Sequence, residues 1–316
     1  MDETAENSHE DLKITFHLTS QDQHLSCSQA FSLSESNHTF YIKDFRLYLH
    51  EVELLSTSEE WVPFQMNNDQ EWSDGNVTLL DFEEGAFNCE ESGTLFMNHE
   101  LNGIVPKDEY QALRFKVGVP FDSNHQDVTL AEAPLDQSSM FWVWQRGYKF
   151  TRFELVQIKT ESGEIESYQP WLFHLGSIGC MSEAATTAPI EACNKVNVPQ
   201  FTLANFDPKN EHILLDLDLL LTGIDLEENT EGTPLGCMSM SSEQVECSKL
   251  FSHFGLDFMS GIPLSQTVNC DASAHQDALC SGPFRVTENR NHHHNHNREE
   301  EINYEAHVSE ANHDHK

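Results

Sequence analysis

The segment from Met140 to Phe150 concentrates side chains that could bind a soft metal or undergo oxidation. It holds two of the five tryptophans of the chain, Trp142 and Trp144, and one of its eight methionines. Read as a β-strand, it would place Met140, Trp142 and Trp144 on one face, because side chains alternate along a strand. A thioether and two indoles would then line one strip. A buried aromatic strand in a β core is the plain structural alternative.

Two histidines are candidate partners for this strip. Cu(I) prefers soft thioether sulfur and also accepts imidazole nitrogen. His125 lies in a loop after the predicted strand 112–119, and His174 precedes Leu-Gly-Ser-Ile-Gly-Cys. Either imidazole is a candidate metal ligand, and the alternative is a hydrogen-bonded structural histidine. Further candidates of lower rank are His50, His99 and His253.

The motifs of familiar enzymes are absent from the sequence. Ser177 in His-Leu-Gly-Ser-Ile-Gly does not match the Gly-x-Ser-x-Gly elbow of hydrolases, and no His-Glu-x-x-His zinc motif occurs. Asp216 and Asp218 lack the further spaced oxygens of a calcium loop. A copper oxidase would need a substrate pocket and an open coordination position, and the sequence indicates neither. We therefore expect a binding protein that is not an enzyme.

Alternation of apolar and polar residues predicts a mainly β fold, an antiparallel β-sandwich-like single domain with long disulfide-stapled loops and few short helices. The segments that read as strands are 12–18, 39–55, 77–82, 112–119, 140–146 and 148–158, while 212–221 fits a strand or a helix. We expect a flexible N-terminus over 1–11, the β domain over 12–287, and a disordered, His-rich acidic tail over 288–316. In the tail, a weak divalent metal site and an unstructured tract are equally good interpretations of His292, His293, His294 and His296.

Eight cysteines stand in the chain, and none forms Cys-x-x-Cys. This argues against a zinc ribbon or covalent haem and favours disulfides made in an oxidising compartment. Many pairings are possible, but short loops favour three of them and leave a fourth, so that the expected set is Cys180–Cys193, Cys237–Cys247, Cys270–Cys280 and Cys27–Cys89. We expect a periplasmic or extracellular protein whose signal peptide has been removed.

The balance of charge excludes one class of partner. The chain carries 53 acidic and 17 basic residues, for a formal net charge of −36. Such a surface repels nucleic acid phosphates and anionic membranes. No apolar run of the sequence is long enough to span a bilayer. We therefore expect neither nucleic acid binding nor a transmembrane segment, and charge by itself names no function.

Long motifs in a fixed order connect the sequence to a known family. These motifs are Asp44-Phe-Arg-Leu-Tyr, Leu79-Leu-Asp-Phe-Glu, Gly118-Val-Pro with Asn124-His125, Pro134-Leu, Ser139-Met-Phe-Trp-Val-Trp-Gln with Gly147-Tyr-Lys-Phe, and His174-Leu-Gly-Ser-Ile-Gly-Cys180. Through them the chain resembles the MbnP family, copper-binding partners of MbnH-type di-haem peroxidases, over residues 12 to 285.

The resemblance implies that the partner peroxidase oxidises Trp142 to kynurenine and that Cu(I) then binds beside it. Met140 and one histidine, His125 or His174, would be fellow ligands. Indole is a poor metal ligand, whereas kynurenine offers an aniline nitrogen and a ketone oxygen. Trp144 would either relay an oxidising equivalent or simply pack there. The histidine tail and the Cys270–Cys280 loop depart from the family pattern and raise the possibility of a second copper site.

The expected function is therefore that of a periplasmic Cu(I)-binding protein of copper homeostasis whose site forms after oxidation of Trp142. Transport, storage and sensing are not separated by the sequence. The alternative is an extracellular β-sandwich module whose aromatic strip binds a ligand or a protein surface without any metal.

Overall fold

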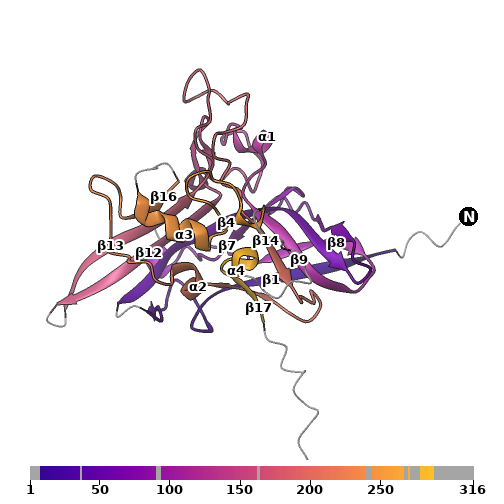
Figure 1. Cartoon of the computed structure of the whole chain (residues 1–316), viewed down its shortest axis with the longest axis horizontal. Coiled ribbons are helices and arrows are strands. Elements are labelled where there is room, and N and C mark those ends of the chain that lie inside the picture. Colours follow the sequence, from indigo (N-terminus) through magenta and orange to yellow (C-terminus); the bar gives the residue numbers. More distant parts are fainter. Residues whose placement is uncertain are drawn as a thin grey trace, which may run out of the picture.

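The structure is a computed structural model that describes residues 8–35, 38–89, 94–161, 164–239, 244–266, 270 and 278–287. The predicted tail, 288–316, lies outside the described residues. Figure 1 shows that strands dominate and helices are short. The strands are β1 His9–Ser20, β2 Gln23–His24, β3 Phe31–Ser32, β4 Thr39–Ser56, β5 Trp61–Pro63, β6 Gln65–Met66, β7 Val77–Asp81, β8 Glu100–Pro106, β9 Tyr110–Val117, β10 Phe141–Val143, β11 Gly147–Tyr148, β12 Thr151–Glu161, β13 Glu164–Leu175, β14 Gln200–Ala204, β15 Ile213–Asp216, β16 Gly236–Met238 and β17 Phe284–Val286.

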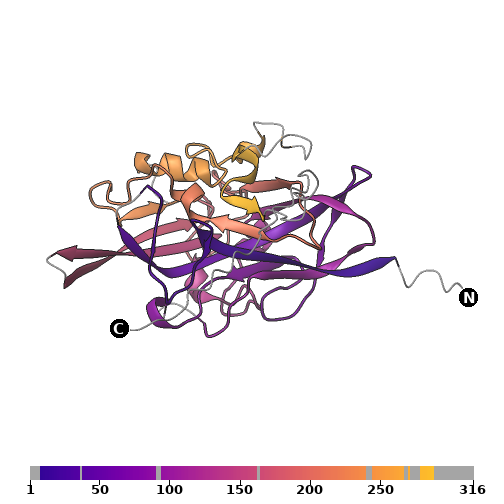
Figure 2. The same cartoon turned by 90° about the horizontal axis from the view of Figure 1, so that it is seen from below.

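The α-helices of the described chain have six residues or fewer, and single turns of 3-10 helix supplement them. The α-helices are α1 Phe121–Asn124, α2 Leu217–Leu221, α3 Ser248–His253 and α4 Ala278–Ser281, and the 3-10 turns are η1 Phe87–Cys89, η2 Ser138–Met140, η3 Val245–Cys247 and η4 Leu264–Gln266. Figure 2 shows α3 and α4 gathered on one side of the strands. The mainly β, sandwich-like fold with few short helices is confirmed. Among the described helices, none is long and apolar enough to cross a bilayer.

The larger sheet is built around β4. Its strand order is β14-β9-β4-β12-β13-β16, and β3, β5 and β7 also pair with β4. The 18 residues of β4 alternate aromatic and aliphatic side chains with polar ones at each end, which is the pattern of a strand that packs on a core. Pairing is antiparallel except between β13 and β16. This sheet carries β12 and β13, which lead into the candidate site.

The smaller sheet has the order β17-β15-β1-β8-β6, with β2 paired to β1. Strand β1 starts at His9, three residues before the start that alternation predicted. Leu12, Ile14 and Phe16 of this strand are buried, and the odd-numbered residues His9, Asp11 and Lys13 are exposed. The first half of the strand therefore turns one face to the core and the other to solvent, whereas Thr15 and Thr19 farther along the second face are buried.

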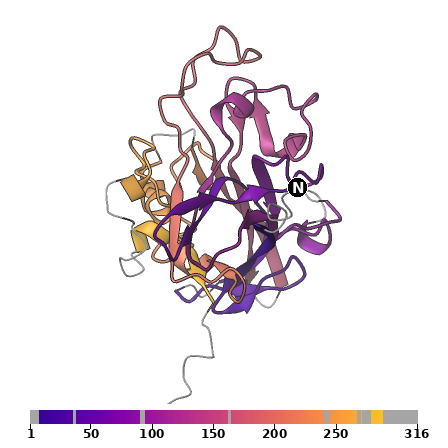
Figure 3. The same cartoon turned by 90° about the vertical axis from the view of Figure 1, so that its right-hand side faces the viewer.

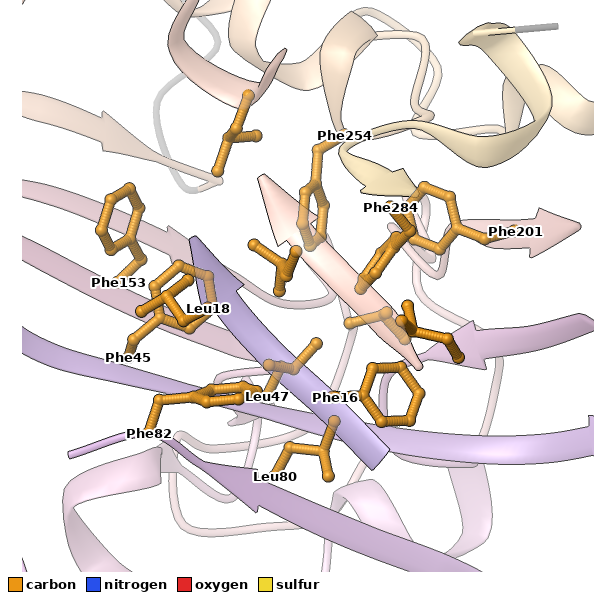
Figure 4. Close-up of a cluster of buried hydrophobic side chains, with 14 of the residues drawn as sticks. Phe16, Leu18, Phe45, Leu47, Leu80, Phe82, Phe153, Phe201, Phe254 and Phe284 are labelled. Atoms are coloured by element: carbon orange, nitrogen blue, oxygen red, sulfur yellow. The ribbon is translucent and has the colours of Figure 1, made fainter. Parts of the chain in front are cut away.

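The core lies between these two sheets. Phe16 of β1 meets Phe115 of β9 edge to face, with ring centroids 5.8 Å apart, so the contact joins the smaller sheet to the larger one. Figure 4 shows Phe45, Phe153 and Phe254 in the same cluster of buried side chains. Each such ring contributes about 1.5–3 kcal/mol to folding by its removal from water.

Four disulfides pin the loops around the sheets, and all four expected pairs are confirmed. They are Cys27–Cys89, Cys180–Cys193, Cys237–Cys247 and Cys270–Cys280. Within the three short pairs the sequence separation is 13 residues or fewer. Proximity along the chain therefore predicted these pairs correctly. The disulfides are consistent with an extracytoplasmic location.

The segment 140–146 is not the single strand that alternation predicted. Met140 ends the 3-10 turn η2, β10 has only three residues, and a turn leads to β11 at Gly147. Gly147 adopts φ +75, a left-handed conformation that glycine allows, and a Cβ there would lie 2.4 Å from the carbonyl oxygen of Asn124. Of the predicted turn or bulge at Gly147, the structure has the turn, and the segment forms a short hairpin in place of one strand.

The ambiguous segment 212–221 divides between the two predicted structures. It forms β15 and then α2, and the change takes place at Asp216. The Asp216 carboxylate accepts hydrogen bonds from the backbone N–H groups of Asp218 and Leu219, which caps the helix.

Candidate metal site

Three segments project together from the two sheets, as Figures 1 and 3 show: the β10–β11 hairpin, α1 and the loop that follows β13. In the hairpin, Phe141 pairs with Tyr148 and Val143 pairs with Gly147. Trp142 is therefore the extra residue of a β-bulge, a feature that redirects a side chain. Its half-buried indole packs on Gly176, where a Cβ would lie 2.5 Å from the ring atom Cζ3. The missing side chain of Gly176 is what provides the space for this ring.

Met140 lies on the inner side of the hairpin. Its side chain is fully buried in a hydrophobic cluster that also contains Tyr148 and Phe150, and Phe141 packs against the same cluster. Met140 and Phe141 thus contact the same cluster, whereas neighbouring residues of a regular strand point to opposite faces. The predicted strip of Met140, Trp142 and Trp144 on one strand face is therefore wrong. The reason is that Met140 belongs to a 3-10 turn and Trp142 to a bulge.

His125 is held beneath the turn of the hairpin. Its Nδ1 donates to the carbonyl oxygen of Trp144 over 2.8 Å, which leaves Nε2 with a lone pair. The amide of Asn124 donates to Nε2 over 3.2 Å, while its Oδ1 accepts from the N–H of Tyr148. The ring is 95% removed from solvent, and burial lowers the pKa of His125. The imidazole is therefore neutral and presents an imine nitrogen.

A disulfide lies beside this nitrogen. The Sγ atom of Cys193 is 3.6 Å from His125 Nε2, and His125, Cys180 and Cys193 offer ligand atoms that all lie within 4.8 Å of one another. The group could hold a metal ion through nitrogen and sulfur. The two sulfurs are bonded to each other, however, and metals bind thiolates rather than disulfides. While the disulfide is intact, His125 is the ordinary ligand of this group.

His174 lies on β13, two residues before the glycine that contacts Trp142. Its Nε2 donates to the carboxylate of Glu154 over 2.8 Å. The other ring nitrogen, Nδ1, is buried and accepts no hydrogen bond from the described residues. Burial lowers the pKa of His174, although the bond to Glu154 opposes this. Gly176, on which the Trp142 ring packs, follows the last residue of β13, Leu175.

The two imidazoles follow one pattern. Each donates one ring N–H to an oxygen, from the Trp144 carbonyl or the Glu154 carboxylate, and each keeps a lone pair on the other nitrogen. Metal-binding histidines are held in this way by an oxygen acceptor, which fixes the tautomer and aims the free nitrogen. Both predicted histidines are thus buried, neutral and suited to ligate. They are brought to the hairpin from different elements, a loop after α1 and strand β13.

A buried network of charges supports the start of the hairpin. Arg46 forms an ion pair with Asp44 and donates to the Ser139 hydroxyl over 3.0 Å. Arg152 donates to Glu154 over 2.7 Å, and Lys149 donates to the carbonyl oxygen of Ser139 over 2.7 Å.

Two pKa shifts describe this network. Burial alone would raise the pKa of Glu154, but hydrogen bonds from His174 and Arg152 lower it to about 2. Burial lowers the pKa of Lys149 to about 8. An ionised Glu154 therefore holds the ring of His174 throughout the neutral range.

The other candidate histidines lie elsewhere. His50 is buried on β4 at the wall of a cavity of about 470 Å³, which Asn124 and Cys193 also line. Both ring nitrogens of His50 lack a hydrogen-bond partner among the described residues, and burial lowers its pKa to about 4. His253 Nδ1 donates to the carbonyl oxygen of Leu220 over 3.0 Å and thereby ties α3 to α2.

Sequence reasoning missed two residues that shape the site. Asn124 connects His125 to the Tyr148 backbone, and Gly176 receives the indole of Trp142. A signal existed for each, because Asn124 adjoins the candidate His125 and Gly176 follows His174 by two residues. Neither signal specified the contact, which joins segments more than 20 residues apart.

Comparison with known proteins identifies the family of the chain. A family model described as MbnP matches residues 9–239. The chain belongs to the MbnP family. The solved structure of MbnP from Methylosinus trichosporium is similar to this MbnP-family protein with a TM-score of 0.70 and 26% sequence identity, over 88% of this chain and 98% of that one. No curated protein sequence matches the chain. The hairpin, both histidines and Cys180–Cys193 all lie within the matched residues.

Proposed function

We propose that this MbnP-family protein is a periplasmic Cu(I)-binding protein of copper homeostasis, whose site forms after an MbnH-like di-haem peroxidase oxidises Trp142 to kynurenine. The chain is then a substrate of its partner and not itself an enzyme. The observation that carries the proposal is the pair of anchored imidazoles, His125, which donates to the carbonyl of Trp144 in the hairpin, and His174, two residues before the glycine that receives Trp142.

The residues present fit a copper ion. The unpartnered Nδ1 of His174 is a buried lone pair that costs free energy unless something binds it. His125 Nε2 is a second buried lone pair, which accepts from the Asn124 amide and would exchange that bond for the ion, and imidazole is a good ligand for copper. Met140 is the third candidate ligand, and because it is fully buried beneath the hairpin, its participation requires the hairpin to reposition. Either His125 or His174, or both, would hold the ion.

Each part of the chain has a defined task in this proposal. Glu154 and the Trp144 carbonyl orient the two imidazoles, and the cluster around Tyr148 excludes water from the inner side of the hairpin. Kynurenine at position 142 would add an amine and a ketone to the site. Trp142 remains half-buried rather than enclosed, so a partner protein can approach it.

Trp144 has two possible tasks. Its indole is half-buried at the hairpin turn, and its carbonyl is fixed by His125. An aromatic ring in this position can relay an oxidising equivalent between a haem and Trp142, or it can shield the turn. Replacement of Trp144 by phenylalanine separates these tasks, because phenylalanine retains packing and is much harder to oxidise.

The decisive experiment is a peptide map of the protein produced with and without an MbnH-type peroxidase, combined with metal analysis. We expect the tryptophan-to-kynurenine mass change in the peptide that contains Trp142, together with one equivalent of copper, only in the coexpressed sample. An unmodified Trp142 peptide without copper would instead favour an interaction module that binds no metal.

Single variants then assign the ligands. Trp142→Phe should abolish both the modification and the copper. His125→Gln and His174→Gln should leave the modification in place and lower the affinity for Cu(I) by at least roughly tenfold where the residue is a ligand. His253→Gln is the matched control, because its ring serves the α2–α3 contact. Full affinity in Met140→Ala would remove Met140 from the ligand set.

A further inference from the structure

Four histidines meet on the solvent face of the smaller sheet, away from the hairpin. His17 lies on β1 and His24 on β2, whereas His99 and His212 immediately precede β8 and β15. The His17 and His24 rings contact edge to face with centroids 4.4 Å apart. His99 stacks on His17 at 6.3 Å, and His212 lies at 5.1 Å from it. His17 is thus the centre of a cluster of imidazoles, here called the four-histidine cluster.

The register of the strands creates this cluster. His17 is on the outer face of β1, and His24 pairs with Thr19, two residues along the same face. Phe16 pairs with Ile213 in the parallel β1–β15 contact, which brings His212 to the adjacent strand. The backbone oxygen of His99 accepts from the N–H of Phe16 over 2.8 Å. Three strands therefore bring their histidines to β1 by main-chain hydrogen bonds.

One pair of ring nitrogens is already close, because His17 and His212 are hydrogen-bonded to each other. No three of the four histidines place ring nitrogens within 4.8 Å of one another in the described chain, so the other rings must turn to reach an ion. His17 Nε2 and His212 Nδ1 are 2.9 Å apart. Two nitrogens bound at right angles to one ion with bonds of about 2.0 Å lie roughly 2.9 Å apart. His24 and His212 are exposed, and His99 is half-buried, so their rings can turn toward an ion without disturbing the core.

Within the cluster, the His17–His212 hydrogen bond links β1 to the start of β15. Positive charges on several imidazoles at such distances would repel one another. The pKa of His17 is lowered to about 4, mainly by burial and to a smaller extent by repulsion from His24, His212 and His99. The net charge of −36 for the whole chain attracts cations to its surface.

We propose that the four-histidine cluster is a second metal site, which takes a divalent transition ion that prefers imidazole, with Cu(II) bound more tightly than Zn(II). Imidazole ligands suit both ions, and divalent copper forms the stronger complexes with nitrogen. The site is independent of the Trp142 site because it uses other residues on another sheet and needs no oxidised tryptophan. It would bind Cu(II) in protein made without any haem partner.

The test titrates Cu(II) into full-length protein produced without a peroxidase. In the parent for this test, the seven histidines that follow residue 290 are replaced by glutamine, so that the tail does not compete. Electron paramagnetic resonance reports how many nitrogens bind the ion, and competition with a chromophoric chelator gives the affinity for Cu(II) and for Zn(II). The variants are His17→Gln and His212→Gln, with His9→Gln on the same strand as the matched control.

We expect one tight equivalent of Cu(II) in the parent, with at least three bound nitrogens and weaker binding of Zn(II). His17→Gln and His212→Gln should each lower the Cu(II) affinity by more than about tenfold, while His9→Gln leaves it unchanged. Circular dichroism of each variant shows that it is folded. Equal Cu(II) affinity of His17→Gln and His9→Gln, or a spectrum dominated by oxygen ligands, overturns the proposal whatever the state of Trp142.

Discussion

Replacement of Gly176 by alanine tests the seat of Trp142 directly. The added Cβ would lie 2.5 Å from Cζ3 of the indole and 2.6 Å from the carbonyl oxygen of Tyr148, whereas ordinary contacts begin at 3.4 Å. The ring must therefore move by about 1 Å. Overpacking of this kind costs about 1–3 kcal/mol of stability. The contacts between the hairpin and the end of β13 should be disturbed most.

The assay combines global and local measurements. Urea unfolding followed by circular dichroism gives the free energy of unfolding of Gly176→Ala and of the parent. Acrylamide quenching, with Trp142→Phe as the reference for the other tryptophans, reports the exposure of the Trp142 indole. We expect a loss of about 1–3 kcal/mol and stronger quenching of Trp142 in Gly176→Ala.

A double-mutant cycle isolates the contact between the two residues. Phenylalanine at position 142 lacks the ring atoms that meet Gly176, so Gly176→Ala should cost less in the Trp142→Phe background. The coupling should be about 0.5–3 kcal/mol, and the part of the cost due to the Tyr148 carbonyl should remain. Equal costs in both backgrounds, with unchanged quenching, would refute the inference that the indole rests on Gly176.

Three further predictions concern the support of the site. Glu154→Gln should destabilise the protein at pH 7. The difference in free energy of unfolding from the parent should disappear as the pH falls from the ordinary carboxyl pKa of 4.5 toward 2, because the stability that an ionised Glu154 provides is lost on protonation. Urea unfolding at several pH values measures this difference. Arg46→Met should cost about 3–5 kcal/mol because it removes the guanidinium that binds both oxygens of the buried Asp44 carboxylate and leaves only the ion pair with Arg152. Lys13→Met, at an exposed ion pair, should cost less than about 1 kcal/mol in the same assay. Removal of the Cys180–Cys193 disulfide by a double alanine substitution should lower the free energy of unfolding by about 2–4 kcal/mol, and an unchanged unfolding midpoint would contradict a stapling role.

Local signals in the sequence were sufficient for much of the fold. Alternation along Leu12 to Leu18 and along 39–55 predicted β1 and β4, because one face of each strand packs on the core. Short spacing predicted three disulfides and left the fourth by elimination. These signals succeed because the relevant physics, side-chain alternation and short loop closure, acts between residues near in sequence.

The hairpin shows why the remaining predictions needed the tertiary structure. Alternation over 140–146 favoured one strand, but Asn124 binds the backbone at Tyr148 and leaves no room for a side chain at Gly147. These contacts join segments that sequence patterns treat separately. The strand is therefore replaced by a turn, a bulge at Trp142 and a buried Met140.

The sequence by itself determined the ligand types that are present, the mainly β class and the family, since these follow from residue identity and short-range pattern. Only the tertiary structure decided which nitrogen of His125 and of His174 carries the proton, because each tautomer depends on an oxygen brought from another segment. The same holds for His17 and His212, which are 195 residues apart and become neighbours through the pairing of β1 with β15. Strand pairing between distant segments is set by burial of the whole core, and no local pattern contains it.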